Sequence, residues 1–199
     1  LLAELGNLPL FSPNQDSPLN VDAVVQATDQ LSRKRVGCIV AIEQIVDVHQ
    51  ETQGGVLIDC ALTPEMLDSI FYPNSPLHDG GVVIHGDRIM YASCIFPLTR
   101  RIDVNQTLGT RHRAAIGLSE ETDAIVVIVS EETGDISYCH DGALHSNVTL
   151  NQLKDFLNEM LKSEAEPAET RSRIQRAKDS LRAMAEIIEK KLRPKEKSN

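Results

Sequence analysis

The sequence contains no tryptophan, and aromatic residues make up only 4% of its 199 residues. Hydrophobic residues reach 41%, so any core must be built almost entirely from aliphatic side chains. No apolar run is long enough to cross a bilayer, and no signal peptide is present. A chain of this length can bury one good core with an appendage, and two full domains are not expected.

Cysteine is also scarce, and its pattern excludes some kinds of site. The four cysteines are widely spaced and form no C-x-x-C pair. Cys38, Cys60 and Cys94 lie in or beside apolar runs typical of strands, which predicts buried free thiols in a reducing cytosol. The six histidines include no pair at i, i+4 and no Cys/His cluster, which argues against zinc.

Basic residues are few in most of the chain. Residues 1–169 carry 10 Lys and Arg against 25 Asp and Glu, a net charge of −15, whereas residues 170–199 carry 10 against 4, a net charge of +6. Such an acidic body repels an extended nucleic-acid backbone, so we expect no nucleic-acid partner. Five of the body's ten basic residues fall between Arg88 and Arg113, a local positive patch that suits a small anionic ligand.

Hydrophobic patterning predicts an α/β fold, in which a central mixed β-sheet is flanked by helices and followed by a C-terminal helical extension. The apolar run 36–42 is expected to be a central strand. Its Gly37 either permits a close backbone approach or weakens the strand. A short strand is expected at 55–60, and segments 81–96 and 124–139 each predict two strands around a turn. These two units favour a mixed sheet over a parallel one.

Helix boundaries are marked by capping residues. Asn20 is the expected N-cap of a helix that runs to about Lys34. Thr63, followed by a proline and a glutamate, predicts a brief helix. Thr149 and Gln152 form a capping box ahead of an amphipathic helix.

The chain is predicted to be one core with additions at both ends. The expected parts are an N-terminal helix and linker (1–19), the core (20–147), a packing helix (148–163) and a helical or partly disordered tail (164–199). In the tail, Ile174, Leu181 and Ile188 stand at heptad spacing. That spacing fits a short coiled coil or partner-binding helix, and fits equally a solvated helix docked by one stripe.

The segment LHDGGVVIHG, residues 77–86, combines an acid with two glycines at the entrance of a strand. Asp79 follows His78 and precedes Gly80 and Gly81, so its carboxylate can approach a metal–phosphate group without steric conflict. Asp-Gly is also ordinary turn chemistry. Taken alone, the segment leaves both interpretations open.

Residues 110–113 place a threonine, two arginines and a histidine at a predicted helix start. With Thr110 as N-cap, a hydroxyl and free amides would face outward, as at phosphate sites. Cations there oppose the helix dipole, so they need either an anionic ligand or carboxylate partners. Arg111 and Arg113 point to nearly opposite sides of a helix, so we expect at most one to contact the ligand directly.

The end of the most hydrophobic strand carries Ser130, Glu131 and Glu132. Ligand sites gather at strand ends in α/β sheets, so a second carboxylate here could share a metal or orient a phosphate. A solvated acidic turn before Gly134 explains the same residues equally well. From the residues alone, the prediction reaches a metal-assisted anion or nucleotide site.

Four segments in unbroken order carry the interpretation further: PNSPLHDGGVVI, the FPL step at 96–98, LGTRHRAAIGLSEETDA and VIVSEETG. Together they resemble the diadenylate cyclase domain, over roughly residues 20–145. That family makes cyclic di-AMP from two ATP molecules. The resemblance looks closest to the membrane-anchored cyclase, so we expect a soluble fragment of a protein held at the cytoplasmic face of the membrane by an N-terminal region absent from this chain.

The resemblance also implies roles for individual residues. The implied catalytic residues are Asp79, Gly80, Arg111, His112 and Arg113. The implied ATP-binding residues are Gly81, Phe96, Leu98, Gly109, Thr110, Ser130, Glu131 and Glu132. The implied ligands of a divalent metal, Mg²⁺ or Mn²⁺, are Asp79, His78 and Glu132. Because the product is two-fold symmetric, the implied catalyst is a face-to-face homodimer.

Two positions depart from the family pattern. Gly81 stands where alanine is usual, and Ile95 stands where an aromatic residue near the adenine is expected. Phe96 is the neighbouring aromatic residue, but adjacent strand residues face opposite ways. Two other functions fit the residues: a non-catalytic nucleotide-binding regulator whose C-terminal helix docks a protein partner, and another metal-dependent nucleotidyltransferase.

Overall fold

The computed structural model describes residues 17–101 and 108–164. Contacts divide the chain into two units, Leu1–Leu157 and Asn158–Asn199, and the sheet with the helices that pack on it belongs to the first. The predicted N-terminal helix and the heptad-spaced tail helix lie outside the described residues, so both stay predictions.

A mixed sheet forms the centre of the first unit. Its seven described strands are β1 (Cys38–Ile42), β2 (Gln53–Ala61), β3 (Gly81–His85), β4 (Arg88–Ile95), β5 (Ile125–Val129), β6 (Ile136–His140) and β7 (Ala143–His145). Their order across the sheet is β2-β4-β3-β1-β5-β6-β7. Among these described strands, only β1 and β3 pair in parallel, and the other neighbours are antiparallel. The α/β class and mixed sheet are confirmed.

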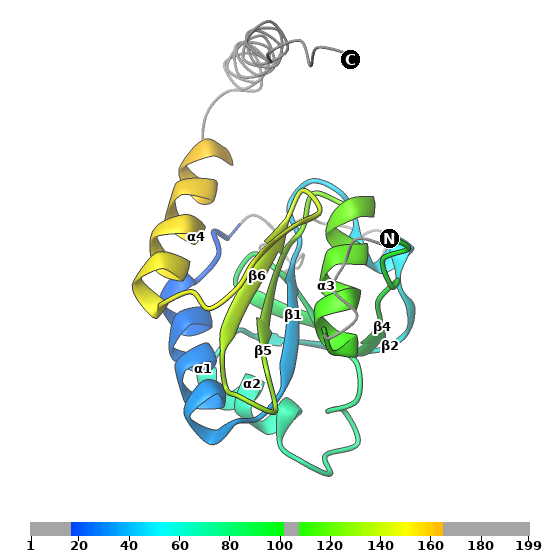
Figure 1. The fold of residues 1–199 in the computed structure, drawn as a ribbon, viewed down its shortest axis with the longest axis vertical. Helices are drawn as coiled ribbons and strands as arrows, with labels where there is room; N and C mark the ends of the chain where they lie inside the picture. The colour runs from blue at the N-terminus through cyan, green and yellow to red at the C-terminus, as the bar shows by residue number, and fades with distance from the viewer. Residues whose placement is uncertain (1–16, 102–107, 165–199) are drawn as a thin grey trace, which may run out of the picture. The chain divides into compact units, whose positions relative to one another are not determined.

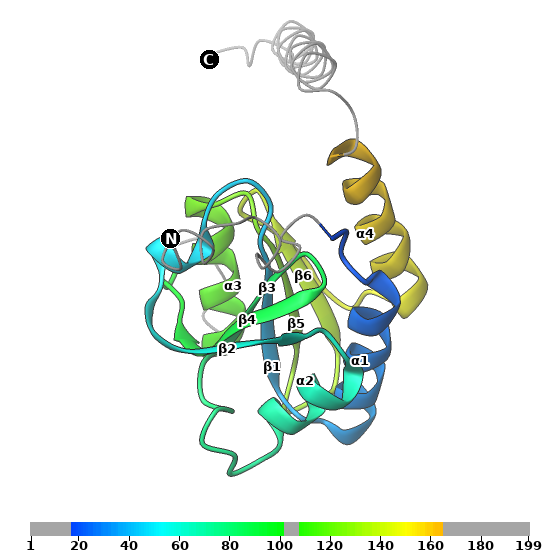
Figure 2. The ribbon, with the colours of Figure 1, turned by 180° about the vertical axis from the view of Figure 1, so that it is seen from behind.

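Helices cover both faces of the sheet. The described helices are α1 (Val21–Lys34), the 3₁₀ helix η3 (Val48–Glu51), α2 (Pro64–Phe71), α3 (Thr110–Glu121) and α4 (Leu150–Glu164). Figures 1 and 2 show α3 against one face, with α1 and the start of α4 on the other. Helix α3 contacts β5, β6 and β1, while α1 contacts β5 and α2. One face of the sheet therefore depends largely on α3.

The capping residues predicted for α1, α2 and α4 begin these helices where expected. Asn20 accepts a hydrogen bond from the amide of Ala23, and Thr63 accepts one from the amide of Met66. The capping box is reciprocal: the Thr149 amide donates to Gln152 Oε1 at 2.8 Å, and the Gln152 amide donates to Thr149 Oγ1 at 3.2 Å. These contacts satisfy amides that a helix leaves unpaired at its start.

The core is aliphatic, with every residue of β1 and β5 buried. The four cysteines are free thiols, and Cys38, Cys94 and Cys139 are buried. Cys60, which was predicted to be buried, is only partly buried because it lies on the mostly exposed strand β2. Burial raises the pKa of the Cys38 thiol to about 12 and that of Cys94 to about 11. Both thiols are therefore protonated and unreactive at neutral pH.

Two strands differ from the prediction. β2 has nine residues rather than the short strand expected at 55–60, because it pairs with β4 across an irregularity between Leu57 and Cys60. Its residues are mostly exposed, since β2 is an edge strand. β7 was not predicted; it has three residues and depends on pairing with β6, so it carries too little local pattern to detect.

Candidate functional site

A cavity of about 630 Å³ opens where β3 and α3 begin. Its lining residues are Ile39, Asp79, Gly80, Gly81, Ser93, Cys94, Ile95, Phe96, Leu98, Thr110, Arg111, Ala114 and Glu131. Sheet topology brings these segments together, because the parallel strands β1 and β3 begin at this edge while their antiparallel neighbours β5 and β4 end there. The cavity therefore combines apolar side chains with the carboxylates of Asp79 and Glu131 and the guanidinium of Arg111.

The loop that carries Asp79 sits on a bulge of β4. Register shifts between Gly81 and Val83 interrupt the β3–β4 ladder, and Ser93 there has φ 58. The Ser93 hydroxyl donates a hydrogen bond of 2.7 Å to the backbone carbonyl of Asp79. Gly80 has φ 105, and a Cβ there would lie 2.8 Å from the carbonyl oxygen of Cys94. Only glycine fits this close, left-handed turn.

Gly81 lies directly against the ring of Phe96. A Cβ on Gly81 would lie 3.1 Å from Cδ2 of Phe96 and closer still to Cε2 and Cζ. Phe96 is 5% exposed and packs in a buried cluster with Ile39, Cys94 and Ala114. Ile95, by contrast, is 63% exposed at the end of β4. Both neighbours nevertheless line the cavity.

Helix α3 begins one residue earlier than the Thr110 cap requires, which makes that prediction wrong. Gly109 is the N-cap, with extended backbone and no side-chain hydrogen bond to the helix, and Thr110 is already the first helical residue. The amide of Arg113 donates to the carbonyl of Gly109. Amides before it have no partner further back in the helix, so they can face an anion.

Arg111 pairs with Glu131 while it lines the cavity. The distance from Arg111 Nη1 to Glu131 Oε2 is 2.5 Å, and the side chains are 27% and 62% exposed. A Cβ on Gly37 would lie 2.8 Å from this Nη1 and 2.9 Å from Glu131 Cβ. Of the two interpretations of Gly37, the structure therefore favours close approach. Arg111 has the carboxylate partner that the sequence left open, and it also reaches the ligand space.

Six predicted site residues do not line the cavity: His78, Gly109, His112, Arg113, Ser130 and Glu132. The Nδ1 of His78 is 2.5 Å from the Ser75 carbonyl, so this ring nitrogen bonds its own loop. The side chain of Arg113 is exposed, which fits the expectation that the two arginines diverge. His112 is half-buried, and desolvation lowers its pKa, which favours a neutral ring.

The described residues contain no group of three or more His, Cys, Asp or Glu side chains that could hold a metal ion. Of the charged side chains that line the cavity, only Asp79 has no ion-pair partner among the described residues. Mg²⁺ commonly binds through one or two carboxylates plus substrate phosphates and water. The donor set thus fits a divalent ion that arrives with a polyphosphate, and does not fit a resident, fully protein-ligated metal.

Four lining residues were missed by sequence reasoning: Ile39, Ser93, Cys94 and Ala114. Ile39 and Ala114 look like ordinary core residues and carry no sequence signal. Ser93 and Cys94 directly precede the Ile95–Phe96 step, which was the one available hint. The bulge that turns Ser93 toward Asp79 depends on pairing with β3 and could not be found locally.

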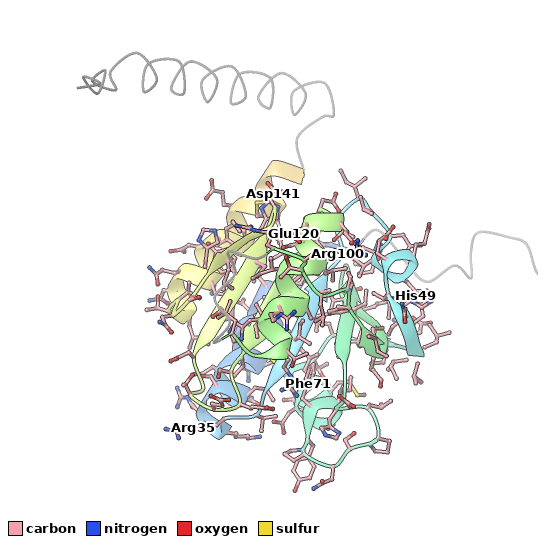
Figure 3. All side chains as sticks on the ribbon, turned by 45° about the vertical axis from the view of Figure 1, so that its right-hand side comes forward. Arg35, His49, Phe71, Arg100, Glu120 and Asp141 are labelled. Atoms are coloured by element: carbon pink, nitrogen blue, oxygen red, sulfur yellow. The ribbon has the colours of Figure 1, made fainter. Side chains whose placement is uncertain are left out.

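A second cavity, of about 520 Å³, lies at the other end of α3 and is strongly acidic. Its lining includes Glu120, Glu121, Asp123 and Asp141, with Arg101 as its basic residue. Figure 3 shows Glu120 and Asp141 near one another, far from Phe71 at the opposite end. The carboxylates would repel a polyphosphate, so the first cavity is the better candidate for an anionic ligand.

Comparison with protein families matches residues 25–144 to the family described as DAC, DisA bacterial checkpoint controller nucleotide-binding. The chain is 38% identical over 137 residues to cyclic di-AMP synthase CdaA of Bacillus subtilis, covering 69% of this chain and 50% of that protein. It is 42% identical over 136 residues to diadenylate cyclase CdaS of Bacillus thuringiensis, covering 68% and 66%. The chain thus spans about half to two thirds of the length of these relatives.

Two solved structures share the fold. The crystal structure of a double mutant of DacA from Staphylococcus aureus superposes with a TM-score of 0.67 at 37% identity, covering 70% of this chain and 93% of that one. A protein from Bacillus cereus, described as a hypothetical membrane spanning protein, gives 0.65 at 39% identity, covering 66% and 65%. In the part of this chain that is described, no helix combines the length and apolar character needed to cross a bilayer.

Proposed function

Because this chain belongs to the diadenylate cyclase (DAC) domain family, we propose that it condenses two molecules of ATP into cyclic di-AMP and releases two pyrophosphates. One observation carries the proposal: a single cavity presents the Asp79 carboxylate and the Arg111 guanidinium together. Nucleotidyl transfer of this kind needs a group that activates a hydroxyl and a cation that stabilises the charge of the leaving pyrophosphate.

Asp79 serves the attacking end of the reaction. The ribose 3′-hydroxyl of one ATP attacks the α-phosphorus of the other. The bond from that phosphorus to the oxygen that bridges the α- and β-phosphates breaks, and this oxygen leaves with pyrophosphate. The Asp79 carboxylate orients the hydroxyl and accepts its proton as the new P–O bond forms. A divalent cation, Mg²⁺ or Mn²⁺, held by Asp79 and the phosphates would lower the pKa of the hydroxyl and neutralise phosphate charge.

Arg111 serves the leaving end. Its guanidinium and the Thr110 hydroxyl line the cavity at the start of α3, where they can donate hydrogen bonds to phosphate oxygens. Glu131 carries the same sign of charge as a phosphate, so direct binding is unfavourable. Its ion pair with Arg111 supports a positioning role, in which Glu131 keeps the guanidinium turned toward the cavity.

The reaction needs a second copy of the chain. A cavity of about 630 Å³ suits one nucleotide rather than two, since ligand pockets run from about 300 to 1,000 Å³. Each ATP supplies both a hydroxyl and an α-phosphorus, and cyclic di-AMP is two-fold symmetric. A face-to-face pair with two-fold symmetry presents each nucleotide to the other. The exposed Arg113 is available to such a partner.

We also infer that the longer protein is anchored to the membrane through a region outside this chain, with the domain on the cytoplasmic side. A structural relative described as membrane spanning supports this proposal. A reaction that consumes ATP requires the nucleotide pool of the cytoplasm.

The direct test is incubation of the chain with ATP and Mg²⁺ or Mn²⁺, followed by chromatography of the products. We expect cyclic di-AMP, and we expect Asp79→Asn to abolish its formation while the fold is retained. Asp87→Asn is the matched control, because Asp87 is an exposed carboxylate in the turn at the other end of the same hairpin. Full turnover by Asp79→Asn would refute the role of this residue. Another nucleotide product, or bound ATP without any product, would identify a different transferase or a regulator instead.

A further inference from the structure

We propose that Gly81 and Phe96 form a size-complementary pair in which the ring of Phe96 supplies the aromatic contact to the nucleobase and Gly81 provides the room for that ring. The inference rests on the proposed function for the identity of the base, adenine. It concerns two residues that line the same cavity and lie in direct contact with one another.

The first argument is space. A Cβ on Gly81 would lie 3.1 Å from Cδ2 of Phe96 and closer still to Cε2 and Cζ. Carbon atoms in contact prefer separations of about 3.5 to 4.0 Å, so a methyl group and the ring cannot occupy this place together. The ring therefore fills volume that an alanine at position 81 would take.

The second argument is that the ring cannot easily move aside. Phe96 is 5% exposed and belongs to the buried cluster that includes Ile39, Cys94 and Ala114. Interiors are close-packed, so displacing a buried ring requires its neighbours to shift as well. An overlap with an added methyl would consequently change the cavity wall rather than be absorbed by one flexible side chain.

The third argument is direction. Strand β4 ends at Ile95, so the alternation of side chains that holds within a strand does not extend to Phe96. Ile95 is an exposed aliphatic residue at the cavity rim, whereas Phe96 forms part of the wall beside Gly81. Of these two neighbours, Phe96 is therefore the one that brings an aromatic side chain to the cavity wall.

The chemistry of the lining supports a base at this place. Gly81 lies two residues after Asp79, the residue proposed to face the ribose hydroxyl. The apolar lining residues are Ile39, Ile95, Phe96, Leu98 and Ala114. A purine ring binds to flat apolar surfaces, and contact between a base and an aromatic ring strengthens binding. The phosphates are left to Thr110 and Arg111.

A double-mutant cycle tests the pair, with α,β-methylene-ATP and inorganic tripolyphosphate as probes in equilibrium binding. Phe96→Leu should weaken binding of the analogue about 10-fold through loss of the aromatic contact. Gly81→Ala should also weaken it about 10-fold with Phe96 present, and by less than about 3-fold in the Phe96→Leu background, where the ring is gone. Tripolyphosphate has no base, so its affinity should stay within about 3-fold in all variants that fold.

Three results would overturn the inference. The first is an equal loss of affinity on Gly81→Ala in both backgrounds. The second is unchanged binding of the analogue by Phe96→Leu, and the third is a loss of tripolyphosphate binding as large as the loss of analogue binding. If Gly81→Ala alone does not fold, Phe96→Leu and the double variant still test the inference. Both should bind α,β-methylene-ATP more weakly and tripolyphosphate about as well as the unaltered chain. Analogue binding is measured without turnover, so absence of cyclic di-AMP from ATP would refute the proposed function and leave this test intact.

Discussion

Replacing Ser93 should separate the stability of the fold from the activity of the site. Ser93 adopts φ 58 within β4, a left-handed conformation that costs a residue with a Cβ about 1–2 kcal/mol. Its hydroxyl holds the carbonyl of Asp79 at 2.7 Å, and such a hydrogen bond contributes about 0.5–1.5 kcal/mol net. Backbone strain and this hydrogen bond therefore oppose each other at one position.

The two opposing effects give different predictions for two substitutions. Ser93→Ala keeps the strain and loses the hydrogen bond, so the free energy of unfolding should fall by about 1 kcal/mol. Ser93→Gly loses the same bond but relieves the strain, so its stability should stay within about 0.5 kcal/mol of the unaltered chain. Both variants release the backbone of Asp79, and both should lower kcat by a similar factor of about 10.

The measurements are chemical denaturation for stability and the rate of cyclic di-AMP formation for activity. Asn147→Gly is the matched control, because Asn147 has φ 56 and lies between β7 and α4, away from the cavity. It should affect stability alone. The reasoning is refuted if Ser93→Gly retains full activity, or if activity in the two variants follows their stability.

The arginines and His112 give two further expectations. Arg111→Ala should weaken binding of α,β-methylene-ATP by about 10- to 100-fold, since bonds to charged groups contribute about 1.5–3 kcal/mol, whereas Arg113→Ala should stay within about 3-fold; equal losses in titration calorimetry would contradict the division between them. Burial lowers the pKa of His112, so the stability that its neutral form contributes is present above about pH 6.5 and is lost as pH falls. Between about pH 7 and about pH 5, the free energy of unfolding should fall less for His112→Gln than for the unaltered chain. Equal falls would show that His112 is not the source of the pH dependence.

Much of the fold could be predicted from interactions between residues close in the sequence. Asn20, Thr63 and the Thr149–Gln152 box start their helices as predicted, because a cap depends on contacts within one turn. The apolar runs became β1 and β5, since a continuous apolar segment of strand length must be buried. The error at Thr110 is small, yet it shows that a capping residue type does not by itself fix where a helix begins.

The site was predicted less completely, because it is assembled from distant segments. The sequence singled out Asp79 and Arg111, which line the cavity, and also Glu132 and His78, which do not. It had no means to tell these apart, since all four are polar residues at predicted turns or element ends. Alternation along β4 also suggested that Phe96 would face away from Ile95, and the end of the strand removed that constraint.

By itself, the sequence determined the elements, the aliphatic core and the family, because periodicity, caps and motif order are local properties of the chain. Only the tertiary structure decided which motif residues meet. The parallel pairing of β1 with β3 and the antiparallel pairing of β1 with β5 bring Asp79 and Glu131 to one edge, and the packing of α3 on β5 and β1 places Arg111 beside them. Strand register produces the bulge at Ser93, and packing places the Phe96 ring against Gly81. Both depend on contacts between residues far apart in the sequence.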